Sequence, residues 1–93
     1  MKEKLNSNLI GRLNNFTDDF LSAQDGVLDK KTIELIATAV SVCFNCEPCT
    51  DFHINEAIQC GATSEEINKV FQIVTAVSAG KTKVFSRGLK SDF

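Results

Sequence analysis

An all-α fold is predicted by three features of this 93-residue sequence. Apolar residues recur at helical spacing through almost the whole chain, and no segment shows the strict alternation that marks a half-buried strand. The chain also holds a single proline, the residue that most strongly interrupts helices. At this length we expect one domain covering residues 1–93.

The first helix is expected over about residues 4–23. Its apolar residues form one stripe with polar residues between them, which is typical of an amphipathic helix. Gln24, Asp25 and Gly26 should end it, because glycine is favoured just past a helix end. The stripe comprises Leu5, Leu9, Ile10, Leu13, Phe16, Phe20 and Leu21.

A second helix is expected over about residues 30–44, with Asp29 as its N-cap. Its sequence leaves little room for a polar face. A helix that is apolar all round is typically buried on all sides, and this one should be. The apolar residues are Ile33, Leu35, Ile36, Ala37, Ala39, Val40, Val42, Cys43 and Phe44.

A third helix should begin between Asn45 and Pro48, since proline is tolerated in a first helical turn. It should end at Cys60, with Gly61 just beyond it.

The fourth helix starts with a capping box, in which Thr63 and Glu66 can each satisfy a free backbone N–H group. Its apolar residues continue to Ala79. Gly80 is a possible break before a separate C-terminal segment. That segment would carry Val84, Phe85 and Leu89.

The second and fourth helices offer more apolar perimeter than so small a bundle can cover. A domain of this size buries only a modest fraction of its surface. The surplus should be buried between subunits, and we therefore expect an obligate homo-oligomer.

Charge and hydropathy exclude several classes of protein. The net charge of −2 leaves no basic footprint, so nucleic acid is not an expected partner. The N-terminus does not resemble a secretory signal, and no apolar run approaches the roughly 18 residues that would span a membrane. We expect a cytoplasmic protein, in which cysteines serve redox or metal chemistry rather than a permanent disulfide framework.

The most informative segment is the Cys-x-x-Cys pair Cys46 and Cys49, followed by the single histidine of the chain, His53. On a regular helix Cys49 and His53 lie one turn apart on the same face. Cys49 lies in a first turn, where free N–H groups and the helix dipole favour a thiolate. The two cysteines are also close enough to form a disulfide. The pattern predicts a nucleophile, Cys49, with His53 as its base.

Glu34 lies in the otherwise apolar second helix and is the candidate for the carboxylate that orients His53. A buried carboxylate needs a partner. The pattern also allows an exposed Glu34, because acidic residues are favoured near helix N-termini.

The other two cysteines have simpler interpretations. Cys43 lies in the apolar helix and is expected to be a small buried hydrophobe, and Cys60 a packing residue. Zinc is disfavoured, because about 10 Å of helical rise separates Cys46 from His53 and zinc needs every ligand within about 2.3 Å. We expect neither a metal nor another cofactor.

The ordered pattern of these residues resembles the carboxymuconolactone decarboxylase and alkyl hydroperoxidase D-like family, over about residues 28–80. The segments that carry the resemblance are Lys31–Ala37 with Glu34, Cys46–His53, Ala57, Gly61–Thr63 and Glu65–Ile67.

The resemblance implies an antiparallel helical bundle assembled as trimers or hexamers. It implies that Cys49 attacks a hydroperoxide, that Cys46 resolves the sulfenic acid as a disulfide, and that His53 and Glu34 form a proton relay. The alkyl hydroperoxidase has a further histidine before its second cysteine, where this chain has Pro48. This departure from the family pattern implies weaker turnover or a different substrate.

The resulting expectation is a thiol-dependent peroxidase with peroxiredoxin-type antioxidant activity, or a disulfide reductase. Its partners would be a hydroperoxide and an external dithiol, such as a thioredoxin- or lipoyl-type reductant. One alternative is a lyase acting on a small cyclic acid, which would need a cationic pocket. Another is a non-enzymatic redox-sensing assembly protein, whose cysteine pair would oxidise without turnover.

Overall fold

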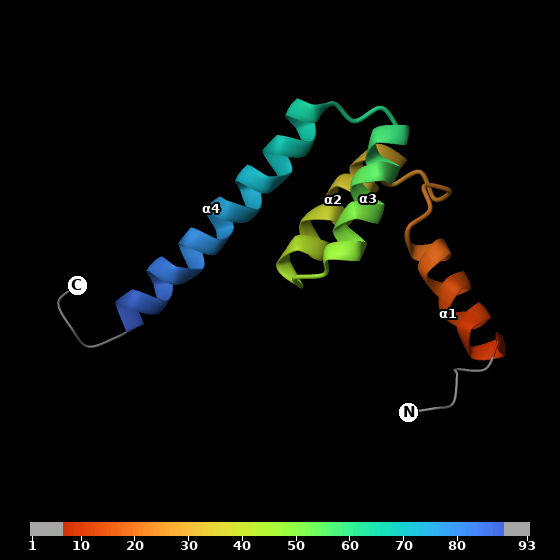
Figure 1. The fold of residues 1–93 in the computed structure, drawn as a ribbon, viewed down its shortest axis with the longest axis horizontal. Helices are drawn as coiled ribbons and strands as arrows, with labels where there is room; N and C mark the ends of the chain where they lie inside the picture. Colours follow the sequence, from red (N-terminus) through yellow and green to blue (C-terminus); the bar gives the residue numbers. More distant parts are fainter. Residues whose placement is uncertain (1–6, 89–93) are drawn as a thin grey trace.

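The computed structural model describes residues 7–88, with the backbone alone for residues 7, 8 and 10. Its four helices are α1 (Ser7–Phe20), α2 (Lys30–Cys43), α3 (Glu47–Gln59) and α4 (Ser64–Gly88), and this part of the chain contains no strand (Figure 1). The predicted all-α class is confirmed. Within these same residues, no helix combines the length and the apolar character needed to cross a bilayer.

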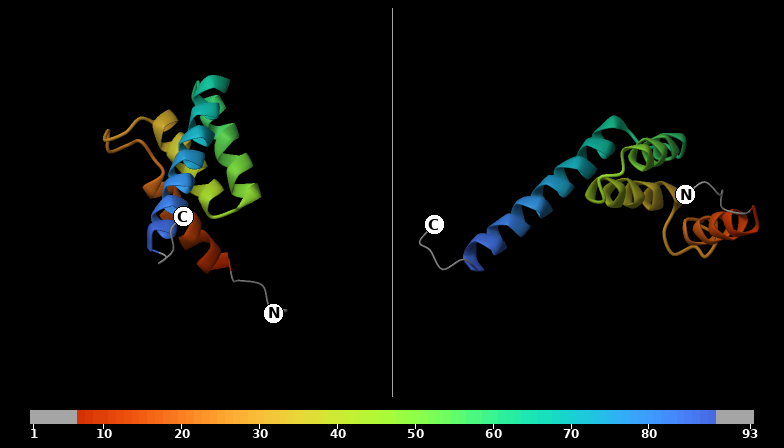
Figure 2. Two further views of the ribbon diagram at one scale, coloured as in Figure 1. Left: turned by 90° about the vertical axis from the view of Figure 1, so that its left-hand side faces the viewer. Right: turned by 60° about the horizontal axis from the view of Figure 1, so that its bottom comes forward.

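Helices α2 and α3 form an antiparallel hairpin at the centre of the molecule, and α1 and α4 extend from it on opposite sides (Figures 1 and 2). The hairpin turn is closed by backbone bonds from Asn45 N–H to Val42 O (2.9 Å) and from Cys46 N–H to Ser41 O (3.0 Å). Asn45 adopts a positive φ of 57°, a conformation that asparagine tolerates better than most residues. This tight turn brings the start of α3 beside the end of α2.

The predicted starts of α2 and α4 are confirmed, and side-chain caps stabilise both. Asp29 caps α2 by accepting the backbone N–H of Thr32 at 2.8 Å. At α4, Thr63 N–H donates to Glu66 Oε1 (2.9 Å) and Glu66 N–H donates to Thr63 Oγ1 (3.1 Å). These reciprocal bonds are the predicted capping box.

Two predicted boundaries differ from the structure. Helix α1 ends at Phe20, before the expected end at residue 23, and Gly26 takes its positive φ of 73° in the loop beyond. Helix α4 runs through Gly80 without a break, because a helical glycine costs only about 1 kcal/mol relative to alanine and does not by itself end a helix. The predicted first helix includes residues 4–6, and the predicted C-terminal segment includes Leu89. These positions lie outside the described residues, as does the side chain of Ile10.

Burial in α2 is the reverse of what its composition predicts. Its buried residues are polar, namely Glu34, Thr38 and Ser41, whereas Ile36 and Val40 are about half exposed. Thr38 and Ser41 satisfy their hydroxyls on backbone carbonyls one turn back. The prediction that α2 is buried on all sides is therefore wrong for the single chain. The polar face packs inward against α3, and an apolar face stays open to solvent.

The two remaining cysteines are also placed differently from expectation. Cys43 and Cys60 are both free and exposed, so the interpretation of each as a buried packing residue is wrong for the single chain. Each lies at a helix end, Cys43 as the last residue of α2 and Cys60 as the C-cap of α3, where few neighbours cover it. Ala57 and Val70 are the buried apolar side chains among the described residues.

An ion pair joins α2 to the first turn of α4, with Lys31 Nζ 2.8 Å from Glu66 Oε2. The Lys31 ammonium, helped by the N–H of Thr63, holds the pKa of Glu66 below its ordinary value of 4.5, and Glu66 raises the pKa of Lys31. A carboxyl group whose pKa is lowered by folding stabilises the fold above its ordinary value. That contribution is lost as the pH falls through the lowered value.

Glu66→Gln should therefore weaken the start of α4 at neutral pH and remove much of its sensitivity to acid. Amide hydrogen exchange over residues 64–70 should be faster than in the wild type near pH 6, and the difference should shrink below pH 4.5. Glu65→Gln, in the same turn, is the matched control. Equal exchange in wild type and Glu66→Gln at both pH values would contradict the assignment.

Candidate active site

Cys46 and Cys49 lie at the N-terminus of α3 and are joined by a disulfide, with their Cα atoms 5.3 Å apart. Cys46 is the N-cap, and its Sγ accepts the backbone N–H of Cys49 at 3.3 Å. Pro48 occupies the first turn, where its missing N–H leaves no helical bond unmade. Cys49 is exposed and Cys46 partly so. The pair can therefore be reached by a small substrate or a partner thiol.

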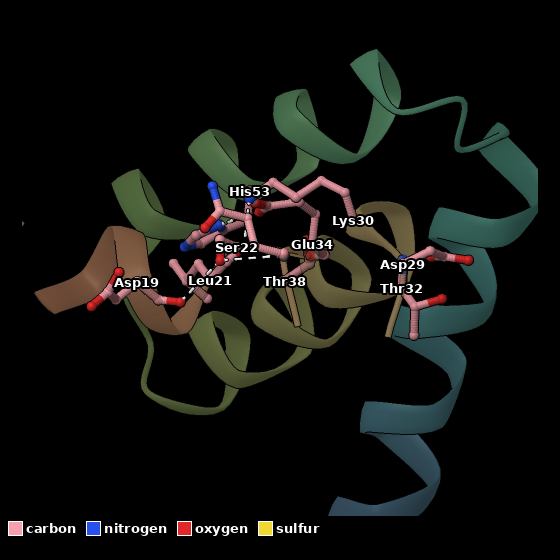
Figure 3. Close-up of polar contacts among 10 residues, drawn as sticks. Asp19, Leu21, Ser22, Asp29, Lys30, Thr32, Glu34, Thr38 and His53 are labelled. Carbon is pink, nitrogen blue, oxygen red and sulfur yellow. Dashed lines mark hydrogen bonds and ion pairs between the residues drawn. The ribbon is translucent and has the colours of Figure 1, made fainter. Parts of the chain in front are cut away.

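His53 follows Cys49 by one turn on the same helix and turns inward, with 15% of its side chain exposed. Its Nδ1 lies 2.6 Å from Glu34 Oε1 across the α2–α3 interface (Figure 3). A carboxylate accepts hydrogen bonds, so Nδ1 of His53 is the donor in this contact. On a helix, residues four apart have Cβ atoms about 5–6 Å apart, so Cys49 and His53 lie on the same face of α3.

Glu34 is 1% exposed, and the interpretation of it as a surface carboxylate is therefore wrong. Both of its oxygens have partners: Oε1 faces His53, and Oε2 lies 2.7 Å from Lys30 Nζ. No buried side-chain nitrogen or oxygen in the described part of the chain lacks a hydrogen-bond partner. The contact expected between Glu34 and His53 is present in the structure.

Lys30 is the member of this cluster that the sequence reasoning missed. Its ammonium bonds Glu34 and also donates to the Leu21 carbonyl at 2.7 Å, just after α1. The available signal was its position four residues before Glu34, a spacing at which oppositely charged side chains meet on a helix.

Two pockets flank the His53–Glu34 contact. One, of about 400 Å³, lies between α2 and the end of α1 with mostly apolar walls, and His53 closes one side. Its other lining residues include Phe20, Leu28, Ile33, Ile36 and Val40. The second, of about 480 Å³, is lined by Lys30 and Glu34 together with Asp18 and Glu56. Because the Lys30 ammonium is already bonded and two further carboxylates line this pocket, its charges do not favour an anionic substrate.

No group of three or more His, Cys, Asp or Glu side chains within residues 7–88 is arranged to hold a metal ion.

The described part of the chain is thus all-helical, and its candidate active site lies in the α2–α3 hairpin. The site holds a Cys-x-x-Cys disulfide and, one helical turn further along α3, a histidine that contacts a buried carboxylate. The model of the carboxymuconolactone decarboxylase family matches residues 11–88, and the chain belongs to this family. The predicted resemblance is thus confirmed, and the match extends beyond residues 28–80 at both ends.

Two curated proteins of unassigned function are similar to the chain. "Uncharacterized protein 4 in cox locus" from Paracoccus denitrificans is 39% identical over 56 residues, which is 60% of this chain and 50% of that protein. An uncharacterized protein from Cupriavidus necator is 32% identical over 65 residues, 70% of this chain and 58% of that protein. The chain thus spans about half the length of these relatives. No solved structure matches the chain.

Proposed function

We propose that this protein is a thiol-dependent peroxidase or disulfide reductase that uses Cys46 and Cys49 as a redox pair. The observation that carries the proposal is the carboxylate-backed His53, placed one helical turn from an exposed Cys49 that shares a disulfide with Cys46. A nucleophile, a base and a group that orients the base are the parts of an activated thiol.

In the first step Cys49 is the nucleophile. Its thiol gives a proton to His53, while Glu34 holds the ring through Nδ1. The thiolate attacks the hydroperoxide, so that an S–O bond forms and the O–O bond breaks. Cys49 is oxidised to a sulfenic acid, and the peroxide is reduced to an alcohol that takes the proton from His53.

In the second step Cys46 resolves the sulfenic acid. Its sulfur attacks Cys49, forming the S–S bond of the structure and releasing the oxygen as water. An external dithiol then reduces this disulfide by two exchange steps and becomes a disulfide itself. We place this cycle in the cytoplasm, where dithiol reductants are available.

The residues that line the pocket beside His53 indicate which class of peroxide the site would accept. The mostly apolar pocket next to His53 would accept the organic part of an alkyl hydroperoxide better than a charged group. Pro48, which stands where the alkyl hydroperoxidase has a second histidine, adds no acid–base group. We therefore expect slower turnover than in a site with both histidines.

We also propose that the chain works as a homo-oligomer, a trimer or a hexamer. Ile36 and Val40 on α2, and Ile73 and Val77 on α4, are each about half to two-thirds exposed in the single chain. Ile36, Val40 and Ile73 line one groove between α2 and α4, and contiguous exposed apolar side chains are typical of a protein interface. Light scattering at micromolar concentration should give a mass several times that of the 10.2 kDa chain, and Val77→Glu should lower it. A monodisperse monomer would contradict the proposal.

The functional test is consumption of a small alkyl hydroperoxide by the reduced protein with a dithiol as electron donor. We expect a rate proportional to protein concentration and one dithiol oxidised per peroxide. Consumption no faster than the spontaneous reaction of dithiol with peroxide would rule out the peroxidase. Rapid reduction of a disulfide substrate in the same preparation would then identify the disulfide reductase.

A further inference from the structure

The buried carboxylate of Glu34 contacts two different nitrogen groups, only one of which belongs to the proton relay described above. His53 occupies Oε1 at 2.6 Å, and Lys30 occupies Oε2 at 2.7 Å (Figure 3). The Glu34 side chain is 2% exposed, whereas that of Lys30 is 39% exposed. Lys30 thus extends from the surface of α2 to the Glu34 carboxylate, which is almost fully shielded from solvent.

A buried carboxylate needs a counter-charge, and two groups can supply it here. If Lys30 supplies it, the cluster of Lys30, Glu34 and His53 is neutral overall with His53 uncharged. If Lys30 were absent, the favourable partner for the carboxylate would be a protonated His53, because opposite charges at this distance attract strongly in a poorly hydrated site.

The other charged groups nearby strengthen this argument. Asp18 of α1 and Glu56 of α3 line the same pocket as Lys30 and Glu34. On α4, Glu66 is paired with Lys31. The carboxylates around the site favour a protonated imidazole, and Lys30 is the cation bonded to Glu34 that opposes them.

We propose that Lys30 is a positioning residue that supplies the counter-charge of Glu34 and so keeps His53 neutral and able to accept the proton of Cys49. The inference rests on the proposed thiol chemistry, in which His53 acts as a base. The second bond of Lys30, to the Leu21 carbonyl, fixes the ammonium between the segment after α1 and the carboxylate. This bond holds Lys30 in place although its side chain is partly exposed.

The test is the protonation state of His53 in the oxidised protein, in which neither Cys46 nor Cys49 titrates. Because His53 is the single histidine of the sequence, the imidazole ¹⁵N signals of untagged, labelled protein belong to it alone. In Lys30→Met and Lys30→Gln, the ratio of imidazolium to imidazole at neutral pH should rise roughly tenfold, the factor that about 1.4 kcal/mol of lost charge interaction gives. Lys30→Arg should restore the wild-type ratio.

Lys31→Met is the matched control, since Lys31 is the next lysine of α2 and bonds Glu66 instead of Glu34. Lys30→Gln retains an N–H donor for Leu21 and serves if Lys30→Met does not fold. A wild-type ratio in a folded Lys30→Gln would overturn the proposal, and so would an equal rise in Lys31→Met. This measurement uses no peroxide, so it does not depend on the proposed activity. A wild type without peroxide turnover would refute the proposed function. The ratio of imidazolium to imidazole in His53 would still test the role of Lys30.

Discussion

Cys49→Ser is expected to reduce peroxide turnover to the rate of the dithiol alone, because it removes the atom that attacks the O–O bond. Cys46→Ser should also stop efficient cycling, but for a different reason. Its Cys49 can still be oxidised once, and the sulfenic acid then lacks the neighbouring thiol that forms the disulfide of the structure. Stopped-flow measurement of peroxide loss should show one rapid turnover in Cys46→Ser and none in Cys49→Ser.

The free cysteines provide the controls for this experiment. Cys43 and Cys60 are exposed and can react with peroxide without taking part in the site. Cys43→Ser and Cys60→Ser should each keep the wild-type rate, alone and together. If Cys49→Ser retains wild-type turnover, the mechanism proposed for this pair is wrong.

Removing the charge of Glu34 should have the second largest effect. Glu34→Gln can still accept the Nδ1–H of His53 through its amide oxygen, but it no longer stabilises the ring after the proton has moved from Cys49. We expect the peroxide reaction to slow by about 100-fold, at the lower end of what a positioned base contributes. His53→Gln should slow it at least as much.

A double variant shows whether the two residues act together. Because Glu34 acts through His53, Glu34→Gln in a His53→Gln background should cost little more than His53→Gln alone. Glu65→Gln, which removes an exposed carboxylate in the first turn of α4, should leave the rate close to wild type. Fully multiplicative losses in the double variant would mean that the observed contact has no part in the reaction.

The parts of the fold that the sequence predicts are those decided by local chemistry. Asp29 as a cap and the Thr63–Glu66 box depend on bonds between residues three apart, so the amino-acid order nearly determines them. The same holds for the start of α3 at Glu47, which lies within the predicted interval from Asn45 to Pro48, and for His53 one turn beyond Cys49. The contact between His53 and Glu34 also requires α2 and α3 to lie antiparallel. That arrangement was expected only from the resemblance to a family of antiparallel helical bundles.

The parts that could not be predicted depend on what covers each surface. The composition of α2 says that it is apolar, but not that its polar residues Glu34 and Thr38 face α3 while Val40 stays open. The exposed positions of Cys43 and Cys60 have the same origin, because burial of a small side chain depends on neighbours from other helices or other chains. Lys30 was overlooked because a lysine near a helix start usually has a solvated ammonium.

The most direct test of the central claim is the intact mass of a Cys46→Ser, Cys43→Ser, Cys60→Ser variant after one equivalent of hydroperoxide. This chain keeps Cys49 as its single cysteine, with Glu34 and His53 unchanged. The proposed mechanism predicts a rapid gain of one oxygen atom, located at Cys49 and trapped by a sulfenic acid reagent. The same variant carrying His53→Gln should gain it about 100-fold more slowly. An unchanged mass, or equal rates with and without His53, would contradict the account.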